Sequence, residues 1–310
     1  RTGGREGTLL DLLDRTKTAM GARRLRSWLL NPLRHAEAIN GRQGAVAELK
    51  NDRVARSALA ELLSGVYDIE RLVTKVSLLS AAPRDLVALK NSLSKCPDVN
   101  KQLAAFSSKL AAEINAGVDA VDEAIELIDT AVVDPPPFSI KDGGVIKAGH
   151  NKLLDELREI GSGGKDWMAR LEADERKRTG INSLKIGFNR VFGYYIEVTR
   201  TNLAAIPPDY TRKQTLVNAE RFITPALKEW EEKILTSEEK AKELEASLFA
   251  ALLDDLSFYA GRIRGTAQML SVLDVLVSLA DAAHEFGYVR PEMAAEGGIS
   301  ITGGRHPVVE

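Results

Sequence analysis

The stretch Gly180–Trp230, GINSLKIGFNRVFGYYIEVTRTNLAAIPPDYTRKQTLVNAERFITPALKEW, interrupts a chain that otherwise follows a helical rhythm. Apolar residues alternate with polar or small ones over residues 184–188, as they do in a strand that buries one face. Aromatic and β-branched residues dominate residues 194–200, and both kinds favour strands. A loop that ends in Gly193 separates the two runs. The sequence therefore predicts a β-hairpin inserted between helices.

This β-rich stretch carries more positive charge than the rest of the chain. Between Thr179 and Thr224 there are six Lys or Arg residues and three Asp or Glu residues, whereas the whole chain has a net charge of -2. A small sheet with a basic surplus suggests contact with a polyanion. The alternative is that these are solvated charges on the open face of a sheet.

The composition describes an ordinary water-soluble chain of 310 residues, 44% hydrophobic and 28% charged. The low aromatic content of 5% fits a helix-rich fold. We expect no membrane span, because no apolar run approaches about 18 residues, and the polar start RTGGREGTLL gives no sign of secretion. The single Cys96 excludes an intramolecular disulfide and favours a reducing compartment, where it would be a semi-buried residue at a helix end.

Helical periodicity covers most of the chain before the β-rich stretch. The expected helices lie within 8–31 (one or two), 36–50, 68–80, 83–95 and 99–129 (two). Pro135–Pro137 breaks this pattern, because consecutive prolines cannot be helical, and a short extended segment should follow. Two more helical pieces flank Gly161–Gly164, which we interpret as a loop because it lacks the flanking residues of a phosphate-binding motif.

The longest expected helix begins at Pro225 and runs to about residue 260, roughly 50 Å. Its apolar seam, with alternating steps of three and four, predicts an antiparallel partner helix from the residues before the β-rich stretch. The seam residues are Leu227, Trp230, Ile234, Ser237, Ala241, Leu244 and Leu248. An apolar helix near 264–287 should be interior, and residues 298–301 are predicted to form a strand.

Catalytic and metal-binding patterns are not evident in the sequence. The four histidines are far apart and none stands at metal-ligand spacing from another ligand. Neither a nucleotide-binding loop nor a nucleophile elbow is recognisable. We therefore expect no enzyme activity, no cofactor and no metal for these residues.

Four segments resemble the bacterial MutS family of DNA mismatch repair proteins: Gly7–Leu33, Leu184–Arg200, Arg212–Leu235 and Gly304–Glu310. The resemblance implies a mainly α fold with a small inserted β module, in which long antiparallel lever helices carry a β-clamp at their tip. It implies helical core and lever over 1–165, clamp over 166–224, helices again over 225–297, and the start of an ATPase domain over 298–310. The chain would thus be a fragment without the mismatch-reading and ATPase domains.

The resemblance also implies the function and partners. Clamps of the family close around duplex DNA, so this fragment would hold the DNA backbone without sequence preference, while its lever would couple the clamp to an ATPase. ATP, Mg and a second MutS subunit are expected for the full-length protein only, in the bacterial cytoplasm near the nucleoid. The competing hypothesis is a helical scaffold that binds a protein partner and no DNA.

A clamp that accepts any sequence should contact phosphates through cations and polar donors. Matching to the family motif nominates Arg212, Lys213, Asn218 and Arg221, and charge and position add Lys185 and Arg190. Family members often have Lys where this chain has Val217, which removes one expected contact. The structural alternative is that Arg221 and Asn218 brace Glu220 or cap the helix that begins at Pro225.

Overall fold

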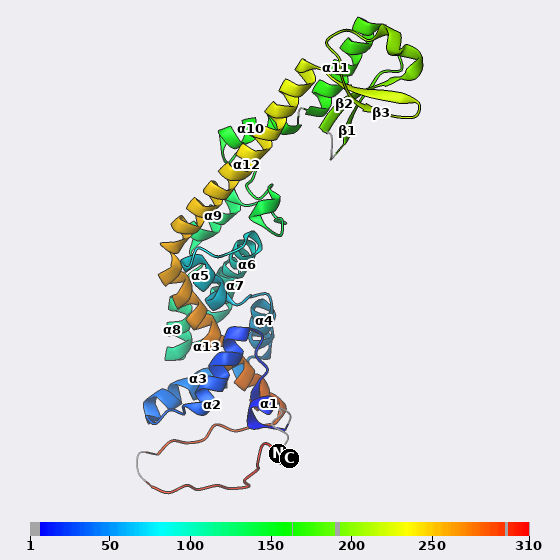
Figure 1. The fold of residues 1–310 in the computed structure, drawn as a ribbon. Coiled ribbons are helices and arrows are strands. Elements are labelled where there is room, and N and C mark those ends of the chain that lie inside the picture. The colour runs from blue at the N-terminus through cyan, green and yellow to red at the C-terminus, as the bar shows by residue number, and fades with distance from the viewer. Residues whose placement is uncertain (1–6, 163, 190–192, 295–296, 310) are drawn as a thin grey trace. The chain divides into compact units, whose positions relative to one another are not determined.

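A computed structural model describes residues 7–162, 164–189, 193–294 and 297–309 (Figure 1). The chain divides into two compact units. Unit 1 comprises Arg1–Ser139 and Ala250–Glu310, and unit 2 comprises Ile140–Phe249. Helices dominate, and the strands form a four-stranded antiparallel sheet. The predicted fold class, mainly α with a small inserted β module, is confirmed, while the domain limits expected at residues 165, 224 and 297 stay predictions.

Unit 1 is helical. Its helices are α1 (Leu9–Leu13), α2 (Ala19–Leu30), α3 (Ala36–Asn51), α4 (Arg53–Ser64), α5 (Ile69–Ser77), α6 (Pro83–Leu93), α7 (Cys96–Leu103), α8 (Lys109–Gly117), α9 (Asp122–Ala131) and α13 (Ala260–Glu285). The sequence did not predict α4, and it predicted two helices where α7, α8 and α9 lie. Cys96 lies at a helix end, as the first residue of α7, but it is fully buried and not semi-buried as predicted, and burial raises the pKa of its thiol to about 12.

Helix α13 forms the centre of unit 1 and packs against α2, α3, α4, α5 and α8. By length and composition it could cross a membrane, contrary to our expectation, but 67% of its most apolar window is buried. Burial of this kind is typical of a core helix in a globular protein. Pro135–Pro137 lies outside any helix, as predicted, after α9 ends at Ala131, and residues 298–301 form no strand.

Polar residues on α13 connect it to the segment before α2. The Asp274 carboxylate accepts hydrogen bonds from the backbone N–H groups of Lys17 and Thr18, both at 2.8 Å, and from the Thr18 hydroxyl at 2.7 Å. Burial raises the pKa of Asp274, although these hydrogen bonds oppose the effect. One turn further, Ser278 accepts from the N–H of Arg15 at 2.8 Å. These bonds satisfy groups that would be costly to bury alone.

Unit 2 contains the sheet and the helices next to it in sequence. Its elements are η1 (Ile140–Asp142), α10 (Lys152–Ser162), α11 (Gly164–Thr179), β1 (Lys185–Asn189), β2 (Gly193–Thr199), η2 (Arg200–Ala205), β3 (Thr211–Thr215), β4 (Ala219–Ile223) and most of α12 (Pro225–Ser257). The strand order is β1-β2-β4-β3. The β1–β2 hairpin confirms the prediction, whereas β3 and β4 were not predicted.

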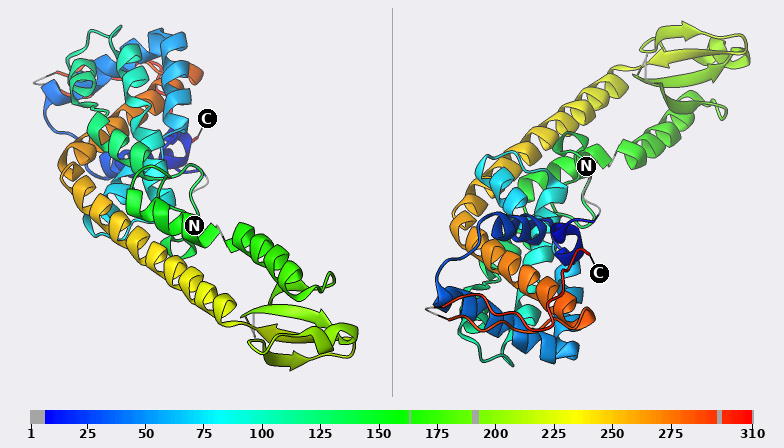
Figure 2. Two further views of the ribbon diagram at one scale, coloured as in Figure 1. Left: turned by 90° about the horizontal axis from the view of Figure 1, so that it is seen from above. Right: turned by 90° about the horizontal axis from the view of Figure 1, so that it is seen from below.

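Within unit 2, α10 and α11 run antiparallel to α12 (Figure 2). Arg158 of α10 contacts Glu245, and Trp167 of α11 stacks on Trp230 with ring centroids 4.8 Å apart. Because higher residue numbers on one side meet lower numbers on the other, the helices point in opposite directions. The predicted antiparallel partner is therefore confirmed, in two helical pieces.

A buried carboxylate holds this helix pair together. Glu245 accepts hydrogen bonds from the N–H groups of Gly144 and Ile146, at 2.8 and 2.9 Å, and from Arg158 at 2.7 Å. Its side chain is 3% exposed. Arg158 also donates to the carbonyl of Ile146 at 2.9 Å, so the ion pair joins the segment before α10, α10 itself and α12.

The β module, residues 180–224, has a small apolar core under one face of its sheet. Ile196 and Val198 of β2 and Phe222 of β4 point into this core. Register pairs Ile196 with Phe222 and Val198 with Glu220. The neighbouring positions Glu197 and Arg221 also pair with each other, and they lie on the opposite, outer face.

Candidate nucleic-acid interface

Arg221 lies on the outer face of the sheet and is held by three neighbours. Its Nε donates to Glu197 at 3.0 Å and its Nη1 donates to Gln214 at 3.0 Å. Its guanidinium lies over the ring of Tyr195, with Cζ 4.0 Å from the centroid. The side chain is only 18% exposed. Arg221 therefore braces the sheet by joining β2, β3 and β4, but through Glu197 and Gln214 and not through Glu220, as the structural alternative had it.

Gly187 makes room for this stack on the outer face. A Cβ atom at Gly187 would lie 2.8 Å from the ring and hydroxyl atoms of Tyr195. Gly187 is opposite Tyr195 in the β1–β2 register, so the tyrosine ring covers the glycine. The stack therefore extends across the sheet from β1 to β3.

Arg212 of β3 faces the buried carboxylate of Glu220. Arg212 Nε lies 2.7 Å from Glu220 Oε2, and the two side chains are 62% and 8% exposed. The oxygen lacks a well-directed hydrogen bond, so the contact compensates charge more than it satisfies the acceptor. The closest contact of the pair uses Nε, and more than half of the Arg212 side chain remains exposed.

Lys185 and Lys213 are exposed and lie on the two edge strands, β1 and β3. Among the described residues, no carboxylate lies within ion-pair distance of either ammonium group. Lys213 stands at an irregularity between Arg212 and Gln214, where β3 has one residue more than β4. Such bulges are frequent on edge strands and discourage pairing with further strands.

Asn218 lies in the exposed turn between β3 and β4, beside Val217, which is 82% exposed. Its carbonyl accepts from the N–H of Arg200 at 3.2 Å, and Arg200 also donates to the carbonyl of Leu216 at 3.1 Å. Neither Asn218 nor Arg221 caps α12. The cap is Thr224, whose hydroxyl accepts from the N–H of Leu227 at 3.3 Å.

The three acids of the module are all engaged by arginines. Glu197 pairs with Arg221, Glu220 with Arg212, and Asp209 with Arg178 of α11. The charges of the β module that no ion pair neutralises are therefore positive. Arg190, the remaining candidate, lies outside the described residues.

The sequence did not identify the residues that join α11 to the sheet. The Tyr210 hydroxyl donates to Glu175 at 2.7 Å, and burial raises the pKa of this tyrosine. Arg178 contacts both Glu175 and Asp209. These residues belong to ordinary charged and aromatic patterns, and only the fold brings them together. Among the described residues, no group of three or more metal-binding side chains occurs.

Residues 1–280 match the family model described as MutS domain III. The chain is 46% identical over 310 residues to the DNA mismatch repair protein MutS of Caldanaerobacter subterraneus subsp. tengcongensis, covering 100% of this chain and 36% of that protein. It is 47% identical over 310 residues to the MutS of Syntrophomonas wolfei subsp. wolfei, again covering 100% of this chain and 36% of that protein. A protein of Haloarcula marismortui named DNA mismatch repair protein MutS 2 is 47% identical over 308 residues, 99% of this chain and 32% of that protein.

The chain thus spans about a third of the length of the curated relatives that it matches. The family model covers most of both units, including every strand of the sheet. The chain therefore belongs to the MutS family.

Proposed function

We propose that the β module holds the sugar–phosphate backbone of duplex DNA without sequence preference, as the clamp of a mismatch repair protein. The observation that carries this proposal is the unbalanced charge of the module: its acids are paired with arginines, and Lys185 and Lys213 remain exposed without a carboxylate partner among the described residues. Exposed lysines without partners attract phosphates, and when they bind, counterions condensed on the DNA are released.

The positions of these lysines suit contact with two phosphates. They lie on opposite edge strands, which are three strand spacings apart, about 14 Å. Arg212 adds an exposed guanidinium edge beside Lys213, and such an edge can bind a phosphate oxygen pair. Contacts of this kind position a protein on DNA and carry no base specificity.

The helices α10, α11 and α12 would serve as the lever in this proposal. The buried Glu245–Arg158 pair and the Trp167–Trp230 stack make the helix pair stiff, which a relay of motion requires. Mismatch recognition, ATP hydrolysis with Mg and pairing with a second subunit belong to the full-length protein. We expect none of them from these residues alone.

The test is a fluorescence anisotropy titration of the chain with a labelled DNA duplex at several salt concentrations. We expect log affinity to fall with log salt by about 0.9 for each phosphate contacted, with about three to five contacts. Lys185→Ala and Lys213→Ala should each reduce the slope by about one. Lys240→Ala, which removes an exposed lysine from α12, is the matched control and should leave the slope unchanged.

Arg212 needs a different substitution because of its buried partner. Arg212→Gln alone would leave the Glu220 carboxylate uncompensated and disturb the sheet. The double variant Arg212→Gln with Glu220→Gln removes both charges and isolates the phosphate contact. If the folded chain binds no DNA at low salt, or binds it with no dependence on salt, the scaffold hypothesis replaces the clamp.

A further inference from the structure

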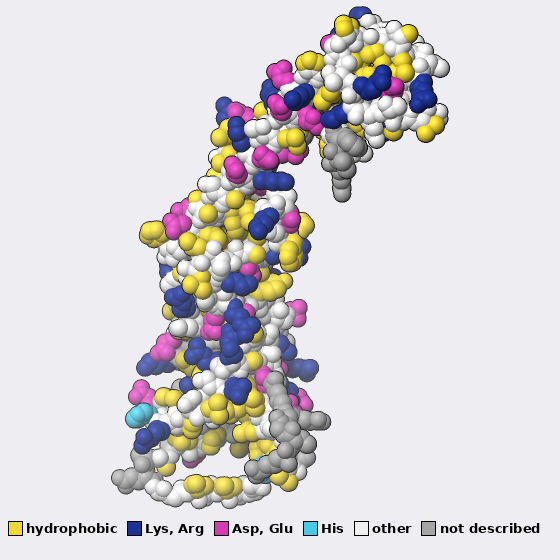
Figure 3. All heavy atoms as spheres, in the orientation of Figure 1, with side chains coloured by type: hydrophobic (Ala, Val, Ile, Leu, Met, Phe, Trp, Pro, Cys, Tyr) yellow, Lys and Arg dark blue, Asp and Glu magenta, His cyan; other side chains and the backbone are white. Residues whose placement is uncertain are grey.

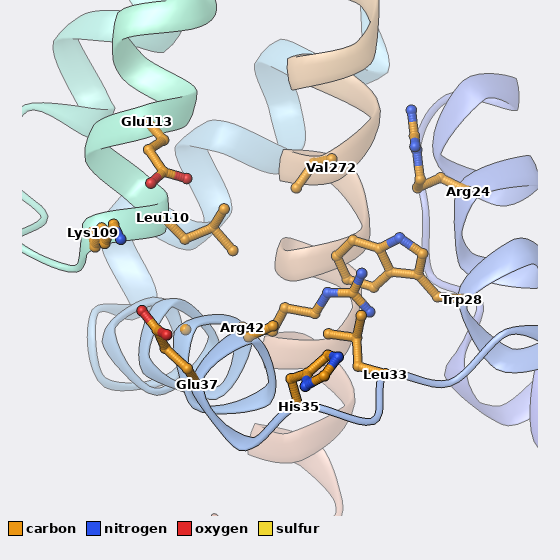
Figure 4. Close-up of a pocket in the computed structure, with 12 residues that line it drawn as sticks. Arg24, Trp28, Leu33, His35, Glu37, Arg42, Lys109, Leu110, Glu113 and Val272 are labelled. Atoms are coloured by element: carbon orange, nitrogen blue, oxygen red, sulfur yellow. The ribbon is translucent and has the colours of Figure 1, made fainter.

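A cavity of about 510 Å³ lies in unit 1, between α2, α3, α8 and α13 (Figure 4). Its walls are largely apolar, formed by Trp28, Leu33, Leu110 and Val272. No residue of the β module lines it. The cavity is large enough for a small organic molecule.

Arg42 projects from α3 into this cavity, and its guanidinium lies over the Trp28 ring, with Cζ 3.4 Å from the ring centroid (Figure 4). A contact of this kind orients the group, and none of the residues that the structure describes accepts a hydrogen bond from its N–H donors. Glu37 and Glu113 also line the cavity, but of the acids that the structure describes, none lies within ion-pair distance of Arg42. Within the described part of the chain, the guanidinium is thus a positive charge without a counterion.

A second arginine belongs to the cavity lining. Arg24 lines the same cavity, held by a hydrogen bond of 3.1 Å from its Nε to the Ser271 hydroxyl. Burial lowers the pKa of Arg42, and the charge of Arg24 lowers it further. An anion bound by Arg42 would relieve this repulsion and satisfy the unused donors.

We propose that this cavity binds a small organic anion, with its phosphate or carboxylate group on the Arg42 guanidinium and an apolar body against Leu33, Leu110 and Val272. The ligand needs both parts because of the residues that line the cavity. Its anionic group would pair with Arg42, and the apolar surface excludes a ligand that is only an ion. This site is separate from the proposed DNA contact, which lies in unit 2.

Trp28 provides a direct spectroscopic reporter. The other two tryptophans, Trp167 and Trp230, stack on each other in unit 2, so Trp167→Phe with Trp230→Phe keeps an aromatic pair and leaves Trp28 as the single tryptophan. Phenyl phosphate, benzoate, inorganic phosphate and neutral benzyl alcohol are titrated into this variant at constant ionic strength. We expect saturable changes in Trp28 emission with phenyl phosphate or benzoate, and weaker binding of inorganic phosphate and benzyl alcohol.

Two substitutions and one control make the test specific. Arg42→Gln should weaken phenyl phosphate binding by about ten-fold or more. Gly41→Met should abolish it by filling the cavity, since Gly41 lines the cavity and a Cβ there meets no atom within 4 Å. Arg26→Gln removes an exposed arginine of α2 outside the lining and should have no effect.

Because Gly41→Met adds bulk in open space, it tests the site even where Arg42→Gln lowers the yield of folded protein. The proposal is overturned if phenyl phosphate and benzoate bind no better than benzyl alcohol up to about 1 mM. Binding that survives both Arg42→Gln and Gly41→Met would overturn it equally, since the ligand would then lie elsewhere.

Discussion

Units 1 and 2 each contain a long helix, and the two helices are stabilised differently. In unit 1, 14 of the 26 residues of α13 are buried, on several sides of the helix. In unit 2, α12 buries a narrow seam and exposes charged residues elsewhere (Figure 3). A helix that is buried on several sides is stabilised by many contacts, whereas a helix that is buried along one narrow seam depends on a few contacts. Single substitutions should therefore act differently in the two units.

The largest effect is expected for Glu245→Ala in unit 2. This change leaves Arg158 and the N–H groups of Gly144 and Ile146 without their acceptor. Loss of one partner from a largely buried ion pair should lower the free energy of unfolding of unit 2 by about 3 kcal/mol. Hydrogen exchange measured by mass spectrometry would locate the loss of protection in residues 140–249.

Glu243→Ala is the matched control, because Glu243 is an exposed glutamate on the same helix. It should change protection in neither unit. Equal loss of protection in both units after Glu245→Ala would contradict the comparison, because the Glu245–Arg158 pair would then support the whole chain and not unit 2 alone.

A second prediction concerns two glycines in helices of unit 1. A Cβ at Gly21 would lie 2.1 Å from Asp274 Oδ2, whereas a Cβ at Gly41 meets no atom within 4 Å. Gly21→Ala should therefore destabilise unit 1 by about 2 kcal/mol, because it displaces the carboxylate that binds Thr18. Gly41→Ala should stabilise it by about 0.5 to 1 kcal/mol, since alanine favours helix. Thermal unfolding followed by circular dichroism compares them, and a Gly21→Ala variant as stable as the parent would refute the close contact.

The third prediction separates bracing from DNA contact within the β module. Arg221→Ala removes the bonds to Glu197 and Gln214 and the stack on Tyr195, so it should destabilise the sheet by about 1 to 2 kcal/mol. Lys213→Ala should change stability by less than about 0.5 kcal/mol. Urea unfolding provides stability, and the DNA titration provides the salt slope. A destabilising Lys213→Ala would mean that this lysine has a structural partner.

The last prediction concerns a small, pH-dependent contribution at a contact between α3 and the residues just before α8. Glu48 accepts hydrogen bonds from the N–H groups of Ser107 and Ser108, each at 3.0 Å. Partial burial opposes ionisation, but the hydroxyl of Ser107, which donates to Glu48 at 2.7 Å, acts together with these backbone bonds to bring the pKa of Glu48 from 4.5 down to about 2. Because the folded pKa is the lower one, the stabilisation is complete above about pH 4.5 and is lost as the pH falls toward 2.

After allowance for solvent screening this contribution is about 1 kcal/mol. Glu48→Gln should therefore cost stability at pH 6 and little near pH 2, measured by thermal unfolding across that range. A loss of the same size at both pH values would show that the contact does not depend on ionisation.

The sequence was sufficient to predict an element where a single hydrophobic periodicity runs through its whole length. The seam of α12 predicted its helix and its antiparallel partner, and the burial of Leu227, Ile234 and Ala241 follows that seam. The β1–β2 hairpin has clear alternation on both sides of a loop. In both cases the periodicity is a property of one helix or one hairpin, so it can be recognised without knowing which elements pack against it.

Other elements gave no such signal. The strand β3 reads TRKQT, without an apolar face, and it is a strand because β4 pairs with it. Helix α4 was missed although its buried residues Leu59 and Leu63 follow helical spacing. For the candidate site, the sequence identified both exposed lysines but could not distinguish them from Arg221. The sequence does not show whether a charged side chain braces a sheet or is exposed to solvent.

By itself the sequence determined the class of the fold, the family and the stretch where positive charge collects, because periodicity, long matching segments and composition are local properties. Only the tertiary structure decided which charges are already neutralised, which carboxylate joins α10 to α12, and that Arg42 lies on Trp28 with no acid of the described residues as its counterion. Those facts depend on distances between residues far apart in the chain, and such distances exist only once the helices and strands have packed.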